Sequence, residues 1–163
     1  MSPRYDVPNA APEPLRQVQL LVNSADVEHG SDWLPDWLAE RGLAGAEGRA
    51  RALREALREL VLANNGFPAS PEALRVVNEA AARIRLRVDE GVHLDSADPL
   101  DGVVATMLAA MLDGTWVRLK ACRNCHWSFY DYSPNRSATW CSMQLCGNRA
   151  KTRAYRKRRT RTG

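Results

Sequence analysis

Four cysteines in the last quarter of the chain constrain its fold more than any other feature. They follow the pattern C-x2-C-x15-C-x4-C, and the 121 residues before them contain no cysteine. A CxxC turn is short enough to direct two thiolates at one metal ion, and a second pair at the start of a helix supplies two more. The pattern predicts a zinc (Zn²⁺) site, with an iron–sulfur cluster as the alternative. The expected ligands are Cys122, Cys125, Cys141 and Cys146.

A zinc ion held by four thiolates has no open position for water, so we expect a structural site and not a catalytic one. His126 adjoins the second cysteine and is expected to lie outside the ligand set. The segment between the cysteine pairs fits a small β-hairpin, with a strand over residues 127–131 and a turn over residues 133–136. Further expectations are a small core of Trp127, Phe129 and Trp140, and an ion pair of Asp131 with Arg136 or Arg149.

Charge is divided unevenly along the chain. Residues 1–117 contain 11 arginines, no lysine and 18 acidic residues, whereas residues 118–163 contain 12 basic residues and one acidic residue. The two regions therefore carry net charges of −7 and +11. An acidic body with a basic tail indicates that the tail meets a polyanion.

The chain from Cys146 onward is predicted to form a basic helix. Arg149, Arg153 and Arg156 fall on one face of it, and such a face fits a major groove, with arginines reaching guanine edges and phosphates. A solvated run of charge is the alternative interpretation. Two alternatives to nucleic-acid contact stay open. Asn148 could cap the helix, and Arg149 could make a cation–π contact with Trp140. The candidate nucleic-acid-binding residues are Asn148, Arg149, Lys151, Arg153, Arg156 and Lys157.

Upstream of the cysteines the sequence has the periodicity of helices. Apolar residues at three- and four-residue steps predict a helix over residues 47–64, and Ser70-Pro71-Glu72 is a typical helix start. The other expected elements are a helix or strand over 15–23, a short helix from Asp32, a helix over 70–88 ending in a short strand at 84–88, and a helix over 100–113.

These patterns predict a mainly α fold with two units. Residues 15–117 are expected to form a helical domain, and residues 118–163 a zinc-bound β-hairpin followed by a basic α-helix. Residues 1–14 are expected to be disordered. Because the sequence shows no signal peptide, no membrane-spanning run and no recognised catalytic motif, we expect a cytoplasmic protein that is not an enzyme and not bound to a membrane.

The C-terminal motifs resemble a known family. Trp140-Cys-Ser-Met143 and Cys146-Gly-Asn-Arg149-Ala-Lys151, with the aromatic residues before them, are similar to the CGNR zinc finger across residues 118–159. The resemblance implies zinc at the four cysteines and DNA contact by the segment that carries Gly147, Asn148 and Arg149.

The N-terminal part resembles the helical ABATE domain, with which this finger is paired in bacterial proteins regarded as stress-linked transcription regulators. Residues 21–24, 28–30 and 37–43 carry this likeness. Regulation by a small-molecule effector is what the family implies. Asn23, Glu28 and His29 form, together with Asp32, a polar cluster that is a candidate ligand-binding site, with a polar loop as the alternative.

Together these features predict a zinc-finger DNA-binding transcription regulator, associated with the nucleoid when bound, whose N-terminal domain acts as a ligand sensor or dimerisation unit. A homodimer is expected because one small finger offers little surface for specific binding. The alternatives are an RNA-binding or ribosome-associated zinc protein, since stacking aromatic residues beside basic ones also suit RNA, and a zinc-stabilised protein-interaction module.

Overall fold

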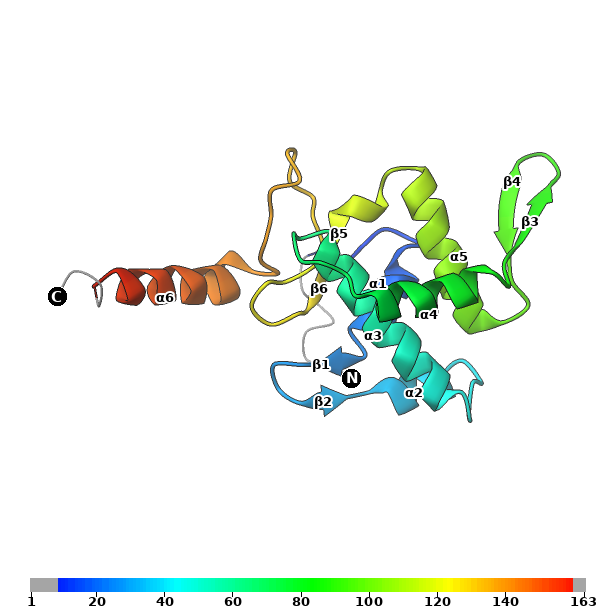
Figure 1. The fold of residues 1–163 in the computed structure, drawn as a ribbon, viewed down its shortest axis with the longest axis horizontal. Helices are drawn as coiled ribbons and strands as arrows, with labels where there is room; N and C mark the ends of the chain where they lie inside the picture. The colour runs from blue at the N-terminus through cyan, green and yellow to red at the C-terminus, as the bar shows by residue number, and fades with distance from the viewer. Residues whose placement is uncertain (1–8, 160–163) are drawn as a thin grey trace.

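In the computed structural model, which describes residues 9–159, helices pack around one core and a C-terminal helix extends away from it (Figure 1). The mainly α class predicted from the sequence is confirmed. The helices are α1 (Arg16–Val22), α2 (Leu34–Ala39), α3 (Glu47–Ala63), α4 (Pro71–Ala81), α5 (Pro99–Leu112) and α6 (Asn148–Arg159), with a 3₁₀ turn η1 (Trp116–Arg118) and a π-helical turn η2 (Met143–Gly147).

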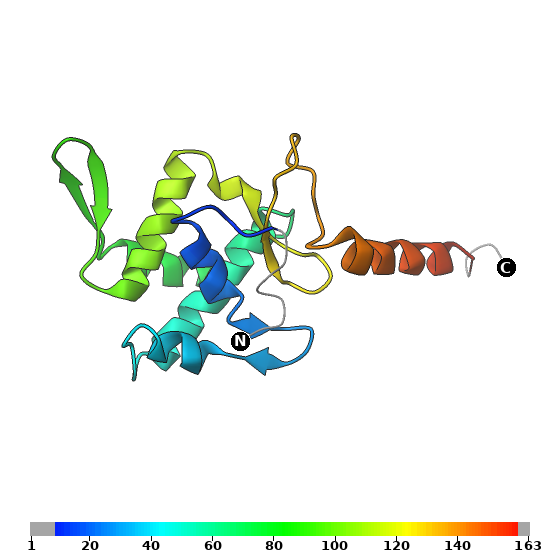
Figure 2. The ribbon, with the colours of Figure 1, turned by 180° about the vertical axis from the view of Figure 1, so that it is seen from behind.

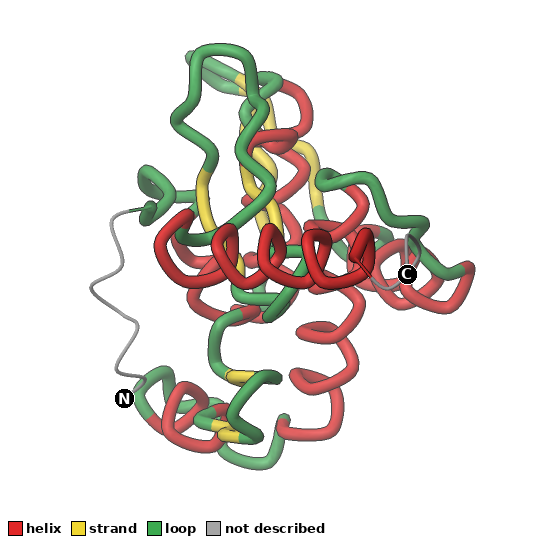
Figure 3. The backbone as a smooth tube through the Cα atoms, turned by 90° about the vertical axis from the view of Figure 1, so that its left-hand side faces the viewer, coloured by secondary structure: helices red, strands yellow, loops and turns green. Residues whose placement is uncertain are grey.

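The strands form short antiparallel pairs among the helices (Figure 3). These pairs are β1 (Ala25–Asp26) with β2 (Ser31–Asp32), β3 (Arg85–Val88) with β4 (Val92–Asp95), and β5 (Leu119–Ala121) with β6 (Ser128–Tyr130). A two-stranded pair has little stability of its own, so each depends on the helices or turns beside it.

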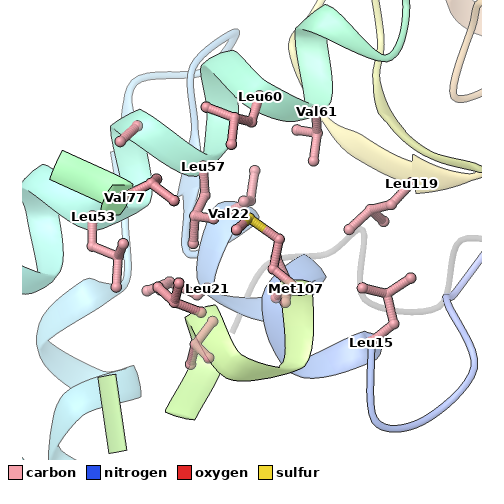
Figure 4. Close-up of a cluster of buried hydrophobic side chains, with 14 of the residues drawn as sticks. Leu15, Leu21, Val22, Leu53, Leu57, Leu60, Val61, Val77, Met107 and Leu119 are labelled. Carbon is pink, nitrogen blue, oxygen red and sulfur yellow. The ribbon is translucent and has the colours of Figure 1, made fainter. Parts of the chain in front are cut away.

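The core lies between α3 and the elements that pack on it, which are α1, α2, α4 and β5. Figure 4 shows apolar side chains from several of these elements pointing into one cluster. They include Leu21 and Val22 of α1, Leu57 and Val61 of α3, Val77 of α4, Met107 of α5 and Leu119 of β5. Strand β5 thus shares the core of the helices that precede it in sequence.

The predicted helix starts are supported by side-chain caps. Ser70 Oγ accepts a hydrogen bond from the Ala73 N–H at 3.1 Å, and Asp98 Oδ1 accepts one from the Leu100 N–H at 2.8 Å. Segment 15–23, left open between helix and strand, forms α1.

Helix α4 ends at Ala81, earlier than the expected end at residue 88. Residues 85–88 form β3, as the alternation in this segment indicated, and pair with β4, a strand that was not predicted. This hairpin lies at the opposite end of the molecule from α6 (Figure 2). On it Leu86 and Val88 are exposed.

The expected disorder of residues 1–14 does not hold for residues 9–14, while residues 1–8 lie outside the described part of the chain. The Asn9 carbonyl accepts a hydrogen bond from the Tyr130 N–H at 2.8 Å, and Ala11 is buried. Gln19 accepts from the Ala11 N–H at 2.7 Å and donates to the Asn9 carbonyl at 3.1 Å. Backbone N–H and C=O groups of this segment therefore find hydrogen-bond partners in α1 and β6, and these bonds hold the segment in place.

The hairpin expected between the cysteine pairs is built differently. Residues 128–130 do form a strand, but its partner is residues 119–121, which precede the first cysteine. The turn at residues 133–136 is present, with the Arg136 N–H donating to the Ser133 carbonyl at 3.2 Å, and it leads into a loop. The partner strand was missed because Leu119 and Ala121 are buried against the helices and their pairing depends on that packing.

Candidate metal centre and basic helix

The first cysteine pair lies in the turn between β5 and β6. The Cys122 N–H donates to the Trp127 carbonyl at 2.9 Å, and the His126 N–H donates back to the Cys122 carbonyl at 2.9 Å. His126 adopts a left-handed backbone conformation with φ of 59°, which closes this tight turn. The turn brings Cys122 and Cys125 to the same side of the hairpin's end.

The four sulfur atoms lie within 4.8 Å of one another, and all four cysteines are buried. The Sγ atom of Cys125 lies 3.6 Å from those of Cys141 and Cys146, and the last two are 3.8 Å apart. Thiolates about 2.3 Å from a tetrahedral zinc ion lie roughly 3.8 Å from each other. The distances and the all-sulfur donor set therefore fit zinc at this site.

The neighbouring sulfurs also shift one another's ionisation. A hydrogen bond from Cys125 lowers the pKa of the Cys122 thiol, and the same partnership raises the pKa of Cys125 to about 12. Buried thiols at this spacing cannot all ionise next to one another unless a cation neutralises them. A bound dication supplies that charge, so the cluster is suited to hold a metal as four thiolates.

The second cysteine pair is shaped by the π-helical turn η2. The Ser142 carbonyl accepts hydrogen bonds from the N–H groups of both Cys146 and Gly147 at 3.0 Å. This wider turn returns Cys146 to the side of Cys141 after four intervening residues, which explains the long second spacing. A Cβ atom at Gly147 would lie 2.7 Å from Met143 Sδ, so a larger residue there would displace Met143.

The aromatic residues near the cysteines form the small core that the sequence predicted. Trp127 and Phe129 are buried with the four cysteines, and Trp140 packs against them at the edge. These rings shield the sulfur cluster from water.

Helix α6 begins at Asn148, two residues after the last cysteine, and two arginines join it to the rest of the molecule. Arg153 donates to Asn124 Oδ1, and Asn124 Nδ2 donates to Cys146 Sγ at 3.6 Å. Arg149 pairs with Glu28, which lies 121 positions earlier in the turn between β1 and β2. The Arg149–Glu28 contact differs from all three sequence interpretations of this arginine, which were nucleic-acid contact, a cation–π contact with Trp140 and an ion pair with Asp131.

The remaining candidate nucleic-acid residues lie along the same helix. Asn148 Nδ2 donates to the Gln144 carbonyl at 3.2 Å, which ties the first residue of α6 to the π turn. Lys151, Arg156 and Lys157 are exposed. A groove of about 410 Å³ runs along the helix, lined by Gln144, Leu145, Asn148, Arg149, Thr152, Arg153 and Arg156.

Asp131 is paired with Lys120, and not with Arg136 or Arg149 as the sequence suggested. Lys120 Nζ lies 2.7 Å from Asp131 Oδ2, and both side chains are almost fully buried. The ammonium also donates to the carbonyls of Arg136 at 2.6 Å and Ala138 at 3.0 Å. This pair therefore fixes the loop between β6 and Cys141 onto strand β5.

Asn64 and Asn65, at the end of α3, hold the metal module, which comprises β5, β6 and the segments that carry the four cysteines. Asn64 Nδ2 donates to the carbonyls of Trp116 at 2.9 Å and Leu119 at 2.8 Å. Asn65 Nδ2 donates to those of Ala121 at 2.8 Å and Thr139 at 3.0 Å. Asparagine ends many helices, so nothing in the local sequence marks these long-range contacts.

Arg58 is a second connection that the sequence did not reveal. It is buried in α3 and donates to the carbonyls of Val22 at 2.7 Å and His126 at 3.3 Å, with Glu55 as its ion-pair partner at 3.0 Å. Burial lowers the pKa of this guanidinium despite the Glu55 carboxylate. A buried arginine in a helix is unusual, and only its tertiary partners explain it.

The three candidate ligand-binding residues near the N-terminus point to different partners. Asn23 is buried, and its side-chain amide pairs with the backbone of Ser128, accepting from the N–H at 2.8 Å and donating to the carbonyl at 2.9 Å. His29 Nδ1 lies 2.9 Å from Asp26 Oδ2, and Glu28 pairs with Arg149. An effector site at these residues stays a prediction, and Asn23 has a structural contact that its sequence context did not show.

We expect Asn23→Ala to destabilise the protein by about 1–3 kcal/mol, because it leaves the buried Ser128 N–H without its acceptor. The measurement is the free energy of unfolding in urea with zinc bound. Asn78→Ala, on the exposed side of α4, is the matched control and is expected to change stability by less than about 0.5 kcal/mol. Equal effects of the two substitutions would contradict the role assigned to Asn23.

Four clustered cysteines beside a β-hairpin, preceded by packed helices and followed by a basic helix, define a zinc-finger protein. Residues 118–159 match the family model of the CGNR zinc finger. Residues 17–115 match ABATE, described as "Putative stress-induced transcription regulator". That match covers more than half of the chain, so the chain belongs to the ABATE family, and the resemblance inferred from its motifs is confirmed.

Both matching families are of regulator or zinc-finger type. Comparison with curated protein sequences gives no significant match. Among the described helices, none has the length and apolar character needed to cross a bilayer.

Proposed function

We propose that this zinc-binding protein is a DNA-binding transcription regulator in which the metal centre holds α6 against nucleic acid. The observation that carries the proposal is a basic helix that starts two residues after Cys146 and projects from the packed helices (Figure 1). Within the described residues, the side chains that line its groove are polar or basic except for Leu145. Such a surface suits phosphate contacts along a duplex, with arginines reaching base edges.

In this proposal the metal site has a mechanical role. The four ligands fix the π turn. Hydrogen bonds from Arg153 to Asn124 and from Asn124 to Cys146 fix the first turns of α6 relative to the sulfur cluster. An isolated helix with this density of positive charge would be weakened by self-repulsion. Zinc binding therefore presents the charge in one orientation, and phosphate binding relieves the repulsion.

The helical region would act as the sensor or dimerisation unit of a stress-response regulator in the bacterial cytoplasm. Hydrogen bonds from Asn64, Asn65 and Arg58 connect the helices to the metal module. They support this role because a change among the helices would reach the base of α6. A homodimer would supply the surface that one finger lacks.

The test is fluorescence anisotropy of a random-sequence duplex DNA titrated with zinc-loaded full chain at several salt concentrations. We expect the double variant Arg156→Ala/Lys157→Ala to weaken binding, and to make the log–log dependence of affinity on salt shallower by about 2, since two phosphate contacts are lost. The matched control is Arg85→Ala/Arg87→Ala, which removes two positive charges from the hairpin at the other end of the molecule (Figure 2).

Competition with a structured RNA hairpin decides between the two nucleic acids. Preference for the duplex DNA supports the proposal, whereas preference for the hairpin would replace it with RNA binding. If the two double variants lose the same affinity, α6 would contribute only through the overall charge of the protein and not as a specific binding surface. Absence of binding at low salt would redirect the search to protein partners.

A further inference from the structure

The turn between β1 and β2 reaches α6 and touches it through one acidic residue. Glu28 pairs with Arg149, the first arginine of α6, and the side chain of Glu28 is only 21% exposed. Arg149 also lines the groove that we propose for nucleic acid. A carboxylate from the acidic body therefore occupies part of the surface that a phosphate would use.

Contacts within this turn fix its shape. The carboxylate of Asp26, itself buried, accepts hydrogen bonds from the N–H groups of Glu28 at 3.1 Å and His29 at 3.2 Å through Oδ1. Its other oxygen, Oδ2, lies 2.9 Å from His29 Nδ1. Strand pairing of Ala25 with Asp32 and of Asp26 with Ser31 closes the turn. Glu28 is thus held in position before it meets Arg149, so little conformational freedom is lost in forming the pair.

We propose that Glu28 competes with nucleic-acid phosphate for the Arg149 guanidinium, so that the β1–β2 turn lowers the affinity of α6 for nucleic acid. The inference rests on the proposed function, because it concerns the same surface. A phosphate that approaches Arg149 meets the Glu28 carboxylate at the same guanidinium. It must displace that carboxylate or remain beside a like charge. Exposed ion pairs of this kind change an equilibrium by about two- to fivefold.

The location of Glu28 gives the competition a regulatory consequence. The turn is continuous with α1 through Asn23 and with α2 through Asp32, which accepts from the Leu34 N–H at 3.0 Å and binds Arg54 at 2.7 Å. A rearrangement of these helices would move Glu28 toward Arg149 or away from it. The helical region would thereby set how much of the α6 surface is available to nucleic acid.

The test measures binding of a labelled random-sequence duplex by four zinc-loaded full-length proteins: wild type, Glu28→Gln, Arg149→Ala and the double variant. We expect Glu28→Gln to raise affinity about threefold at low salt. In the Arg149→Ala background the same substitution should have no effect beyond that of the control. The control is Glu90→Gln, which removes one negative charge from the exposed turn between β3 and β4.

Three results would overturn the inference. A Glu28→Gln protein that binds as Glu90→Gln does, or more weakly than wild type, would show that the pair does not compete with the duplex. An equal gain in the presence and absence of Arg149 would show a general charge effect. If the wild-type protein binds the duplex in a zinc-dependent way, both of these results leave the proposed function intact. Absence of zinc-dependent binding in every variant overturns the proposed function together with the competition.

Discussion

Removal of zinc from the full chain is expected to unfold the metal module and to destabilise the helical region with it. Zinc bound to thiolate sites of this kind contributes about 10–16 kcal/mol of apparent free energy, far more than a small hairpin supplies by itself. Because Leu119, Ala121 and Tyr130 belong to the core shared with α3, loss of the hairpin exposes part of that core. We expect the melting temperature to fall by more than about 10 °C on chelation.

Thermal unfolding followed by circular dichroism, with and without a chelator, measures this effect, and zinc titration should reverse it. Cys141→Ser is expected to reproduce the chelated state because it removes one of the four clustered thiols and leaves the site incomplete. Ser137→Ala, in the exposed loop before that cysteine, is the control and should retain zinc. An unchanged melting temperature on complete zinc removal would contradict the shared core as the link between the two parts.

Breaking the buried Lys120–Asp131 pair is expected to cost about 3–5 kcal/mol, because either single substitution leaves the other charge buried without its partner. Asp131→Asn should release the loop between β6 and Cys141, whose Ser133 and Ala138 N–H groups donate to this carboxylate at 2.9 and 3.1 Å. The measurement is the free energy of unfolding in urea with zinc present. Lys120→Met should also lower the free energy of unfolding. The double variant should lose less stability than the sum of the two single losses.

The same pair gives stability a definite dependence on pH. Burial raises the pKa of Asp131, but the Lys120 ammonium and the hydrogen bonds from Ser133 outweigh it and hold the pKa below its ordinary value of 3.8. The contribution of the pair is therefore complete above pH 3.8 and is lost as the pH falls below that value, through the folded-state pKa.

As a control for the pair, Arg75→Met breaks an exposed ion pair with Glu79 on α4 and should leave the free energy of unfolding nearly unchanged. Destabilisation by Asp131→Asn no larger than that of this control would contradict a structural role for the buried pair.

Features with a local signal in the sequence were predictable. The cysteine spacing predicted the four sulfur atoms that the structure brings together, and the cap at Ser70 predicted the start of α4. Features that depend on a distant partner were not. The strand that pairs with residues 128–130, the order of residues 9–14 and the partner of Asp131 all depend on contacts made only after the helices pack.

The sequence by itself determined the metal-binding cluster, the mainly α class and the basic character of the last helix, because ligand spacing, helical periodicity and charge act over a few residues. The tertiary structure decided how these parts are joined. Asn23 pairs with Ser128, Asn65 with Ala121 and Thr139, and Glu28 with Arg149. Buried polar groups must find partners wherever packing places them, and the local sequence does not say which groups those will be.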